Sequence, residues 1–187
     1  MARQGLNAEK IVSEALALIE EEGFTSFSMH RLAARLNIKT ASLYNHVDNV
    51  DQIGIEIGKI AIERLNVQVA AACRDSKDPA EILMQIAIAH RRFAHDNPEL
   101  YQVILNLPSM QGKSLVRTFL DPMQTALLPF ISDEQTRISA LRAYRSMIHG
   151  FVSLEANGYF EFSGLSIDVS YQMMIRSFIE SIKESDR

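Results

Sequence analysis

Residues 37–47 combine short polar side chains with two amphipathic rings at a spacing that suits a short helix. Leu43 and Val47 lie four residues apart, so a helix would turn both toward a core and leave the neighbouring polar side chains outside. The outward set consists of Thr40, Ser42, Tyr44, Asn45 and His46. Hydroxyl, amide, phenol and imidazole groups can hydrogen-bond base edges and phosphates in the major groove of a duplex. Taken alone, the same pattern also fits the solvated face of an ordinary helix bundle.

Two helices and a tight turn are expected to support this segment. Asn7 is a good N-cap for a first helix that runs to about Glu22, where Gly23 stops it. Ser28 is expected to cap a second, short helix. Asn37 follows where the turn requires a left-handed backbone, which Asn tolerates. The pattern therefore predicts a helix-turn-helix.

Charge is distributed unevenly along the chain. A net charge of −4 and a pI near 5.7 argue against a protein that coats nucleic acid indiscriminately. A site-specific binder needs only a local basic patch, and residues 24–47 contain no acid. Their basic and imidazole side chains are His30, Arg31, Arg35, Lys39 and His46. This asymmetry is modest and supports DNA binding only weakly by itself.

Residues 32–38 and 41–47 closely resemble the DNA-binding unit of the TetR family of one-component transcriptional regulators. The resemblance spans roughly residues 11–60 and includes the Gly23-Phe24 joint and a long helix after the recognition segment. It implies that the third helix enters the major groove and that the start of the second helix adds a contact. Carried onto this chain, it implies base-facing positions at His30, Thr40, Ala41, Ser42 and Asn45, and phosphate-facing positions at Tyr44 and His46. Arg31 and Lys39 complete the predicted DNA-binding set.

Two positions depart from the family's pattern. Lys39 stands where a small capping residue is common, so Thr40 is expected to cap the third helix instead, with the helix starting one residue later. Val50 replaces a frequent Lys in the turn before the fourth helix, so one phosphate contact is expected to be missing. Asp48 and Asp51 nearby repel DNA mildly. We therefore expect weaker or more salt-sensitive DNA binding than in a family member with that Lys.

The rest of the chain also shows helical patterns. Asn49 and Gln52 form a capping pair for a long fourth helix. Pro122 is expected to interrupt or kink a later helix, and Ser132 with Gln135 is expected to cap the penultimate one. Further helices are expected at about 79–96, 98–106, 133–157 and 166–183.

The expected fold is all-α with about nine helices. A helix-turn-helix DNA-binding domain over residues 1–48 is followed, through the long fourth helix, by a helical effector-binding and dimerisation domain over residues 49–187. The resemblance implies a homodimer through the last two helices, about 133–157 and 166–183, and Gly150 would let helices approach closely. The run 145–155 resembles the penultimate helix of a TetR subgroup that carries a His-Gly pair there.

Methionine and aromatic side chains are frequent in the second region. At helical spacing such residues are more often plain core. Within a TetR-like body they could instead line a largely apolar pocket for a small-molecule effector. The candidates are His90, Phe93, Tyr101, Phe119, Met123, Tyr144, Met147 and His149. The sequence does not identify the effector.

Two other classes of protein are weighed against a regulator. His90 and His95 lie five apart, on different helix faces, and the sequence has no nucleophile motif, Gly-rich phosphate loop or paired Glu-His motif. We therefore expect no enzyme, no cofactor and no metal. A structural all-α interaction protein would show no salt-dependent affinity for duplex DNA, whereas a regulator would. The expected function is a sequence-specific DNA-binding regulator: a repressor that binds a near-palindromic operator as a homodimer and is released by a small, largely apolar effector.

Composition fits a globular protein, since 47% of the residues are hydrophobic and only 8 are Gly and 5 are Pro. No run approaches the roughly 18 apolar residues of a membrane span, and the N-terminus shows no signal-peptide core. A cytoplasmic protein without membrane contact is expected. The single Cys73 rules out an intramolecular disulfide, which fits a reducing compartment.

Overall fold

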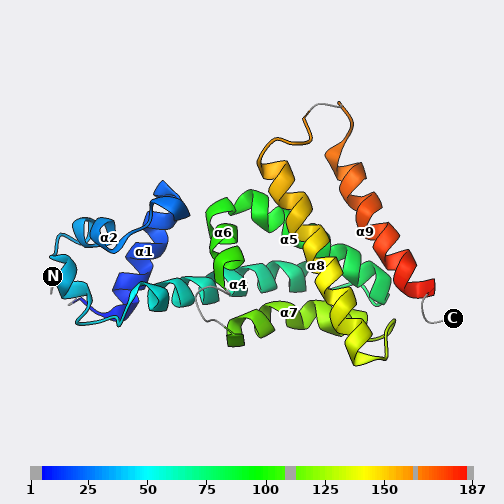
Figure 1. The fold of residues 1–187 in the computed structure, drawn as a ribbon, viewed down its shortest axis with the longest axis horizontal. Helices are drawn as coiled ribbons and strands as arrows, with labels where there is room; N and C mark the ends of the chain where they lie inside the picture. Colours follow the sequence, from blue (N-terminus) through cyan, green and yellow to red (C-terminus); the bar gives the residue numbers. More distant parts are fainter. Residues whose placement is uncertain (1–5, 108–112, 162–163, 185–187) are drawn as a thin grey trace. The chain divides into compact units, whose positions relative to one another are not determined.

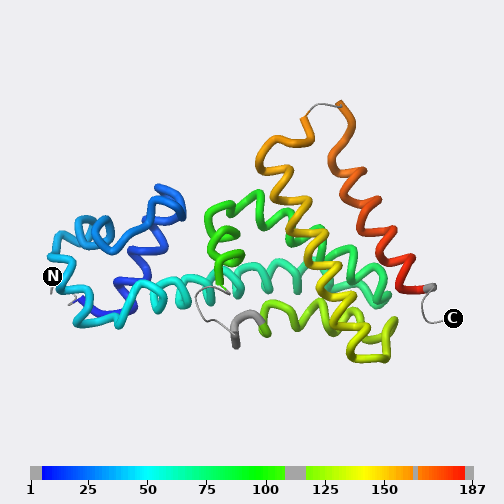
Figure 2. Tube along the Cα trace, viewed as in Figure 1, coloured from blue at the N-terminus to red at the C-terminus, as the bar shows by residue number. Residues whose placement is uncertain are grey.

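The computed structural model of the chain describes residues 6–107, 113–161 and 164–184. Within these ranges the chain is all-α, with nine α-helices, one short 3-10 helix (Phe24–Ser26) and no strand (Figures 1 and 2). The α-helices are α1 (Ala8–Glu22), α2 (Met29–Arg35), α3 (Thr40–Leu43), α4 (Val50–Cys73), α5 (Pro79–Asp96), α6 (Pro98–Asn106), α7 (Lys113–Leu127), α8 (Glu134–Ala156) and α9 (Ile167–Glu184). None of the helices in the described ranges is both long and apolar enough to cross a membrane.

Side-chain caps fix the ends of the first two helices as the sequence predicts. Asn7 Oδ1 accepts the Lys10 N–H at 2.9 Å at the start of α1, and Ser28 Oγ accepts the Arg31 N–H at 3.3 Å at the start of α2. α1 ends at Gly23, whose φ of 91° is readily adopted only by Gly. Both caps are made by a side chain three residues from the amide it binds, so local sequence fixes where α1 and α2 start.

The turn between α2 and α3 depends on Asn37. Its φ of 53° places it in the left-handed region, which confirms the prediction. The next N–H, from Ile38, donates to the Ala33 carbonyl at 3.0 Å and closes the end of α2. Leu32 and Leu43 are fully buried on either side of the turn. α2 and α3 are therefore held against one another by a turn and a small shared core.

The chain forms two compact units. The first consists of Met1–Arg64 and Asn97–Arg117, and the second of Leu65–Asp96 and Thr118–Arg187. The first unit therefore contains α6 together with the helix-turn-helix, and the long α4 runs through both units. The functional boundary after residue 48 stays a prediction.

In the first unit α6 packs against α1 and the short helix that follows it. Glu99 Oε2 accepts the Phe24 N–H at 2.6 Å, just after the Gly23 turn. Gly58 on α4 lies so close to Leu107 that an added Cβ would overlap the Leu107 side chain. A side chain at position 58 would therefore force Leu107 to move.

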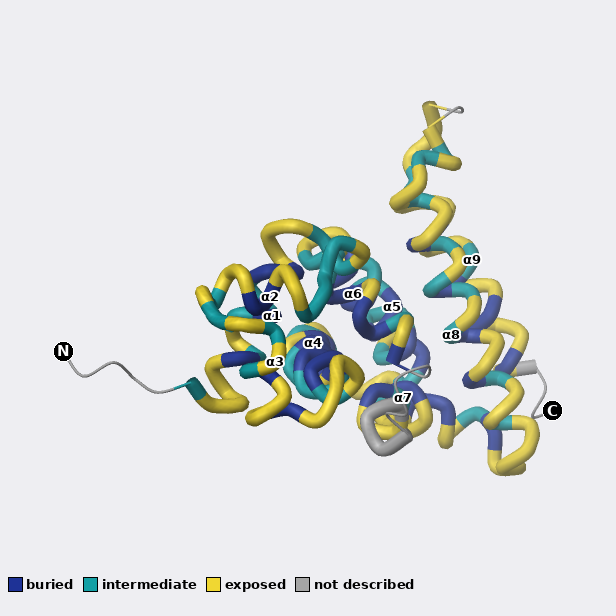
Figure 3. The backbone as a smooth tube through the Cα atoms, turned by 60° about the vertical axis from the view of Figure 1, so that its left-hand side comes forward, coloured by how far each residue is buried: buried dark blue, intermediate teal, exposed yellow. Residues whose placement is uncertain are grey.

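In the second unit α5, α8 and α9 pack on one another (Figure 1). Two buried tyrosines bind the backbone of α5: the Tyr144 hydroxyl donates to the Leu83 carbonyl, and the Tyr171 hydroxyl donates to the Ala87 carbonyl at 2.7 Å. A buried phenol needs such a partner, so these bonds fix α8 and α9 along α5. Figure 3 shows that both α8 and α9 also carry many exposed residues.

The α8 cap differs from the sequence prediction, and α7 is not interrupted, while a kink at Pro122 stays a prediction. Asp133, not Ser132, caps α8, because its Oδ2 accepts the Thr136 N–H at 2.8 Å. Hydrogen bonds from the Thr136 side chain and then from its backbone N–H lower the pKa of the Asp133 carboxyl below its ordinary value. α7 continues through Pro122 without interruption. A proline inside a helix leaves the carbonyl four residues earlier without its helical partner, and Asn66 Nδ2 donates to that Thr118 carbonyl at 3.5 Å.

Candidate nucleic-acid interface and ligand-binding body

The recognition segment begins at Lys39, which occupies the N-cap position of α3. Lys39 has extended backbone and makes no side-chain capping bond. The prediction that Thr40 caps the helix is wrong, because Thr40 is already the first helical residue. The Ser42 N–H donates to the Lys39 carbonyl at 2.8 Å, so the helix starts without a side-chain cap.

α3 ends at Leu43, earlier than the apolar pattern predicts. Residues 44–46 form a turn in which the His46 N–H donates to the Leu43 carbonyl at 2.9 Å. Tyr, Asn and His are weak helix formers, which favours this early end. Leu43 and Val47 are both buried, as predicted. The polar side chains are therefore carried by one helical turn and the tight turn after it.

The predicted DNA-contacting residues lie at the surface. Tyr44 is 52% exposed although its ring is large and apolar. The other exposed members are His30, Arg31, Lys39, Ala41, Asn45 and His46, while Thr40 and Ser42 are half-buried. Their contacts with DNA stay predictions.

Ion pairs reduce the positive charge that the sequence places here. Arg31 pairs with Glu22, and Arg35 Nη1 lies 2.6 Å from Glu21 Oε2. The hydrogen bond from Arg35 lowers the pKa of the Glu21 carboxyl. Among the Lys and Arg side chains of α2, α3 and their turn, all of them described, Lys39 alone has no ion pair. The acids on α1 that accept these pairs were visible in the sequence, but their proximity depends on the packing of α1 against α2.

The start of α4 confirms the predicted capping pair. Asn49 Oδ1 accepts the Gln52 N–H at 2.9 Å, and Gln52 Oε1 accepts the Asp48 N–H at 2.7 Å. Val50, the first residue of α4, is 40% exposed. The surface position where the family frequently has Lys is therefore apolar here.

The second unit brings three of the predicted pocket residues together. The rings of His90 and Phe119 lie 5.3 Å apart edge to face, and those of Phe119 and His149 stack at 6.0 Å. Arg145, which the sequence reasoning did not select for the pocket, lies over Phe119 at 5.3 Å. Its Nε–H donates to His149 Nε2 at 3.2 Å, so that nitrogen acts as an acceptor. The signal was available, because Arg145 and His149 are four apart on one helix.

Both histidines of this cluster are uncharged at neutral pH. Burial, with the neighbouring His149 and Arg145, lowers the pKa of His90 to about 3. Burial and then the charge of Arg145 lower the pKa of His149 to about 4. His90 is the one buried polar residue among the described core positions, and its Nδ1 has no hydrogen-bond partner.

The remaining predicted pocket residues have other surroundings. Tyr144 packs on Phe178 with ring centroids 5.3 Å apart and hydrogen-bonds α5, so it belongs to the core. Phe93 and Met123 are buried, and Met147 is half-buried on α8. Tyr101 lies on α6 in the first unit, so this cluster does not include it.

A cavity of about 340 Å³ lies between the C-terminal part of α4, α5 and α7. None of the predicted pocket residues lines it. Its walls are mostly aliphatic and include Val69, Ile82, Ile86, Pro122 and Ala126, with Asn66 as a polar member. The sequence reasoning missed it because small and branched aliphatic residues at helical spacing also predict an ordinary core. Pro122 was the available signal, since a proline inside a helix changes how closely neighbours pack.

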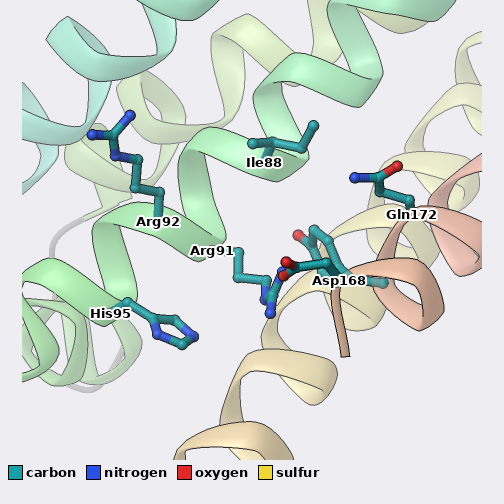
Figure 4. A pocket seen from close by; sticks show the side chains of 7 residues that line it. Ile88, Arg91, Arg92, His95, Asp168 and Gln172 are labelled. Carbon is teal, nitrogen blue, oxygen red and sulfur yellow. The ribbon is translucent and has the colours of Figure 1, made fainter. Parts of the chain in front are cut away.

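A polar groove of about 400 Å³ lies beside α5 and α9 (Figure 4). Arg91 extends from α5 toward Asp168 on α9, and their Nη1 and Oδ1 atoms are 2.6 Å apart. Arg91 also donates to both oxygens of Glu155 on α8, at 2.6 and 2.7 Å, and this hydrogen bonding lowers the pKa of Glu155. Because the carboxylates satisfy Arg91, the network connects three helices and does not offer a free charge to a ligand.

Metal ligation has no support in the part of the chain that the structure describes. No group of three or more His, Cys, Asp or Glu side chains there could hold a metal ion.

Two family models match the chain. "Bacterial regulatory proteins, tetR family" matches residues 11–52, and "Tetracyclin repressor-like, C-terminal domain" matches residues 83–178. The chain is 29% identical over 182 residues to the uncharacterized HTH-type transcriptional regulator YobS of Bacillus subtilis (strain 168), covering 96% of this chain and 94% of that protein. It is 30% identical over 161 residues to the uncharacterized HTH-type transcriptional regulator Rv0681 of Mycobacterium tuberculosis, covering 82% of this chain and 72% of that protein.

Solved structures share the fold. Apo ActR from Streptomyces coelicolor matches with a TM-score of 0.73 at 17% identity, covering 99% of this chain and 98% of that one. A variant of TetR from Acinetobacter baumannii AYE in complex with minocycline matches with a TM-score of 0.63 at 18% identity, covering 98% and 99%. The family models span the helix-turn-helix and most of the helical body. With the relative from Mycobacterium tuberculosis, they show that the chain belongs to the TetR family of DNA-binding transcriptional regulators, which are not enzymes.

Proposed function

We propose that this regulator is a repressor that binds a near-palindromic operator as a homodimer and is released by a small, largely apolar effector. The proposed DNA binding rests on the exposed surface of α3 and of the turn that follows it. On this surface Tyr44 is half exposed and Lys39 makes no ion pair. The surface of one α3 and its turn can contact only a few base pairs. A second copy related by a twofold axis would double the site and improve its specificity.

The proposed residue roles follow the family resemblance. His30, Thr40, Ala41, Ser42 and Asn45 face base edges, Tyr44 and His46 face phosphates, and Arg31 and Lys39 add positive charge. The surface exposure of most of this set supports the assignment.

The proposed dimer uses α8 and α9. Leu154 on α8 is 44% exposed, and Val169 and Met173, four apart on α9, are each 66% exposed. An added Cβ at Gly150 would meet nothing within 4 Å, so this part of α8 is open to a partner helix. Exposed apolar side chains gathered on two helices favour a protein interface. We also propose that the chain belongs to the TetR subgroup that carries a His-Gly pair in the penultimate helix.

The effector half of the proposal assigns ligand binding to the helical body after residue 48. The minocycline complex of the TetR variant supports an effector site in this fold. In this chain the cavity beside α4 and the cluster around His90 are the candidate positions. Because α4 runs through both units, a ligand that favours one arrangement of the body would act on the helix-turn-helix through it. We propose that this regulation takes place in the cytoplasm.

Selection of bound duplexes from a random pool tests the DNA half. We expect a near-palindrome whose half-sites lie about one helical turn, ~34 Å, or somewhat more apart. Tyr44→Ala should weaken binding to every sequence by roughly a hundredfold, because each protomer of the dimer loses one hydrogen bond to a charged phosphate, whereas Asn45→Ala should change the preferred sequence. Tyr159→Ala, which removes an exposed ring from the second unit, is the control. A recovered pool without any shared sequence would overturn the proposal.

A further inference from the structure

A buried hydrogen-bonding atom in the second unit has no partner. His90 is 2% exposed, and its Nδ1 makes no hydrogen bond. Leaving such an atom unsatisfied destabilises a fold, and it is uncommon in native proteins. A ligand that supplies the missing partner would remove this cost.

His90 lies one helical turn from a residue that lines the apolar cavity. It follows Ile86 by four residues on α5, so both side chains stand on the same helix face, and Ile86 lines the cavity. On α7, Phe119 precedes Pro122 by three residues, and Pro122 lines the cavity from the other side. The rings of His90 and Phe119 are in contact, and neither lines the cavity, so the pair stands behind its wall, about one helical turn from Ile86 and Pro122.

The charge beside this pair is positive. The Arg145 guanidinium lies over the Phe119 ring, and its charge lowers the pKa of both His90 and His149 in addition to burial. A positive charge next to an uncharged imidazole favours an oxygen-rich or anionic group. An imidazole that carries its proton on Nδ1 can donate to such a group.

We propose that the cavity binds a compact monocarboxylate whose apolar body lies between α4, α5 and α7 and whose carboxylate accepts a hydrogen bond from His90. The inference rests on the proposed effector function and specifies the chemical class of the effector. The cavity volume of about 340 Å³ is at the lower end of the range for ligand pockets, which suits a compact molecule. Its aliphatic walls suit an alkyl chain, a cationic head group is repelled by Arg145, and a wholly apolar ligand leaves His90 unsatisfied.

Matched eight-carbon probes test the head group. Octanoate, octanamide, 1-octanol and octylamine are titrated calorimetrically into the full chain at neutral pH. Octanoate should bind at least about tenfold more tightly than octanamide and 1-octanol, and octylamine should bind most weakly. Equal affinity for octanoate and octanamide, tighter binding of octylamine, or no binding of octanoate would overturn the proposal.

Substitutions test the position. Ala70 is exposed on α4 and lines the cavity, so Ala70→Phe should reduce octanoate binding by tenfold or more. Ala71→Phe is the matched control, because Ala71 is equally exposed but borders a different groove. His90→Phe keeps an aromatic ring and removes the donor, so it should abolish the preference for octanoate over 1-octanol while 1-octanol still binds. Unchanged octanoate binding in Ala70→Phe would overturn the proposal even if His90→Phe fails to fold.

The operator assay separates this proposal from the proposed function. If octanoate binds with these preferences but the protein stays bound to the selected duplex, the result supports the site and contradicts effector-induced release. A chain that binds duplex normally but does not bind octanoate contradicts the site alone.

Discussion

Acidification should destabilise this fold through two buried histidines. The pKa of His90 is lowered to about 3 and that of His149 to about 4, whereas both side chains titrate near 6.5 in an unfolded chain. Below pH 6.5 the unfolded state therefore takes up protons that the folded state does not, and the free energy of unfolding falls as the pH falls. Each site contributes about 1.4 kcal/mol per pH unit in this window. At about pH 5 the loss is about 2 kcal/mol for each histidine and about 4 kcal/mol for the pair.

Urea unfolding at about pH 7.5 and about pH 5, at one fixed protein concentration, measures this loss. The pKa of Glu21 and that of Glu155 lie below the ordinary carboxylate value, so their contributions are lost at lower pH than this window. His149→Asn should halve the pH-dependent loss, while His46→Asn, which changes an exposed side chain, should leave it intact. A wild-type loss under about 1 kcal/mol, or an undiminished loss in His149→Asn, would refute the reasoning.

Three further predictions concern single contacts. Gly58→Ala should destabilise the fold by about 1–3 kcal/mol in thermal or urea unfolding, because its Cβ would overlap Leu107, and Leu107→Ala should reduce that penalty in the double variant. Arg91→Ala should cost about 1.5–3 kcal/mol, because it removes two charged hydrogen bonds from the Glu155 carboxylate and leaves it only the contact with His95, and a smaller loss in the Arg91→Met and Glu155→Leu double variant would support that cause. Val50→Lys should tighten operator binding several-fold at low salt and steepen its salt dependence, which titration at two salt concentrations would show; equal affinity would argue against a missing phosphate contact.

Helix ends were predictable where the signal is local. Asn7, Ser28 and Asn49 each carry a side chain that reaches an amide only three residues away, so the sequence itself contains both partners. The left-handed Asn37 follows from the same short-range logic. Ser132 shows where this logic fails: two adjacent residues can both cap, and Asp133, one residue further, makes the bond.

The ligand-binding body was less predictable because its features depend on distant pairs. The contact of His90 with Phe119 joins α5 to α7, and the cavity depends on how three helices pack. Composition placed both rings among the candidates, but Tyr101, chosen on the same grounds, belongs to the other unit. The number of large side chains in the sequence therefore suggests a pocket, but it does not show which of these side chains contact one another.

The charge of the recognition surface depends both on the local sequence and on how distant helices pack. The sequence shows Arg31, Arg35 and Lys39 without an acid nearby, but the packing of α1 supplies acids to both arginines. The pair of Arg31 with Glu22 is largely exposed and therefore weak, so a phosphate can compete for Arg31, whereas two acids hold Arg35. Counting Lys39 alone or with Arg31, a dimer neutralises about two to four phosphates through this surface, and log K should fall against log salt with a slope between about −2 and −4. Such a slope is shallow for a DNA-binding protein, so of the two alternatives expected from Val50, weaker binding and greater salt sensitivity, only weaker binding agrees with it. Much of the affinity must therefore come from uncharged contacts, which makes Tyr44, Asn45 and the hydroxyls beside them more important than the local count of basic residues implies.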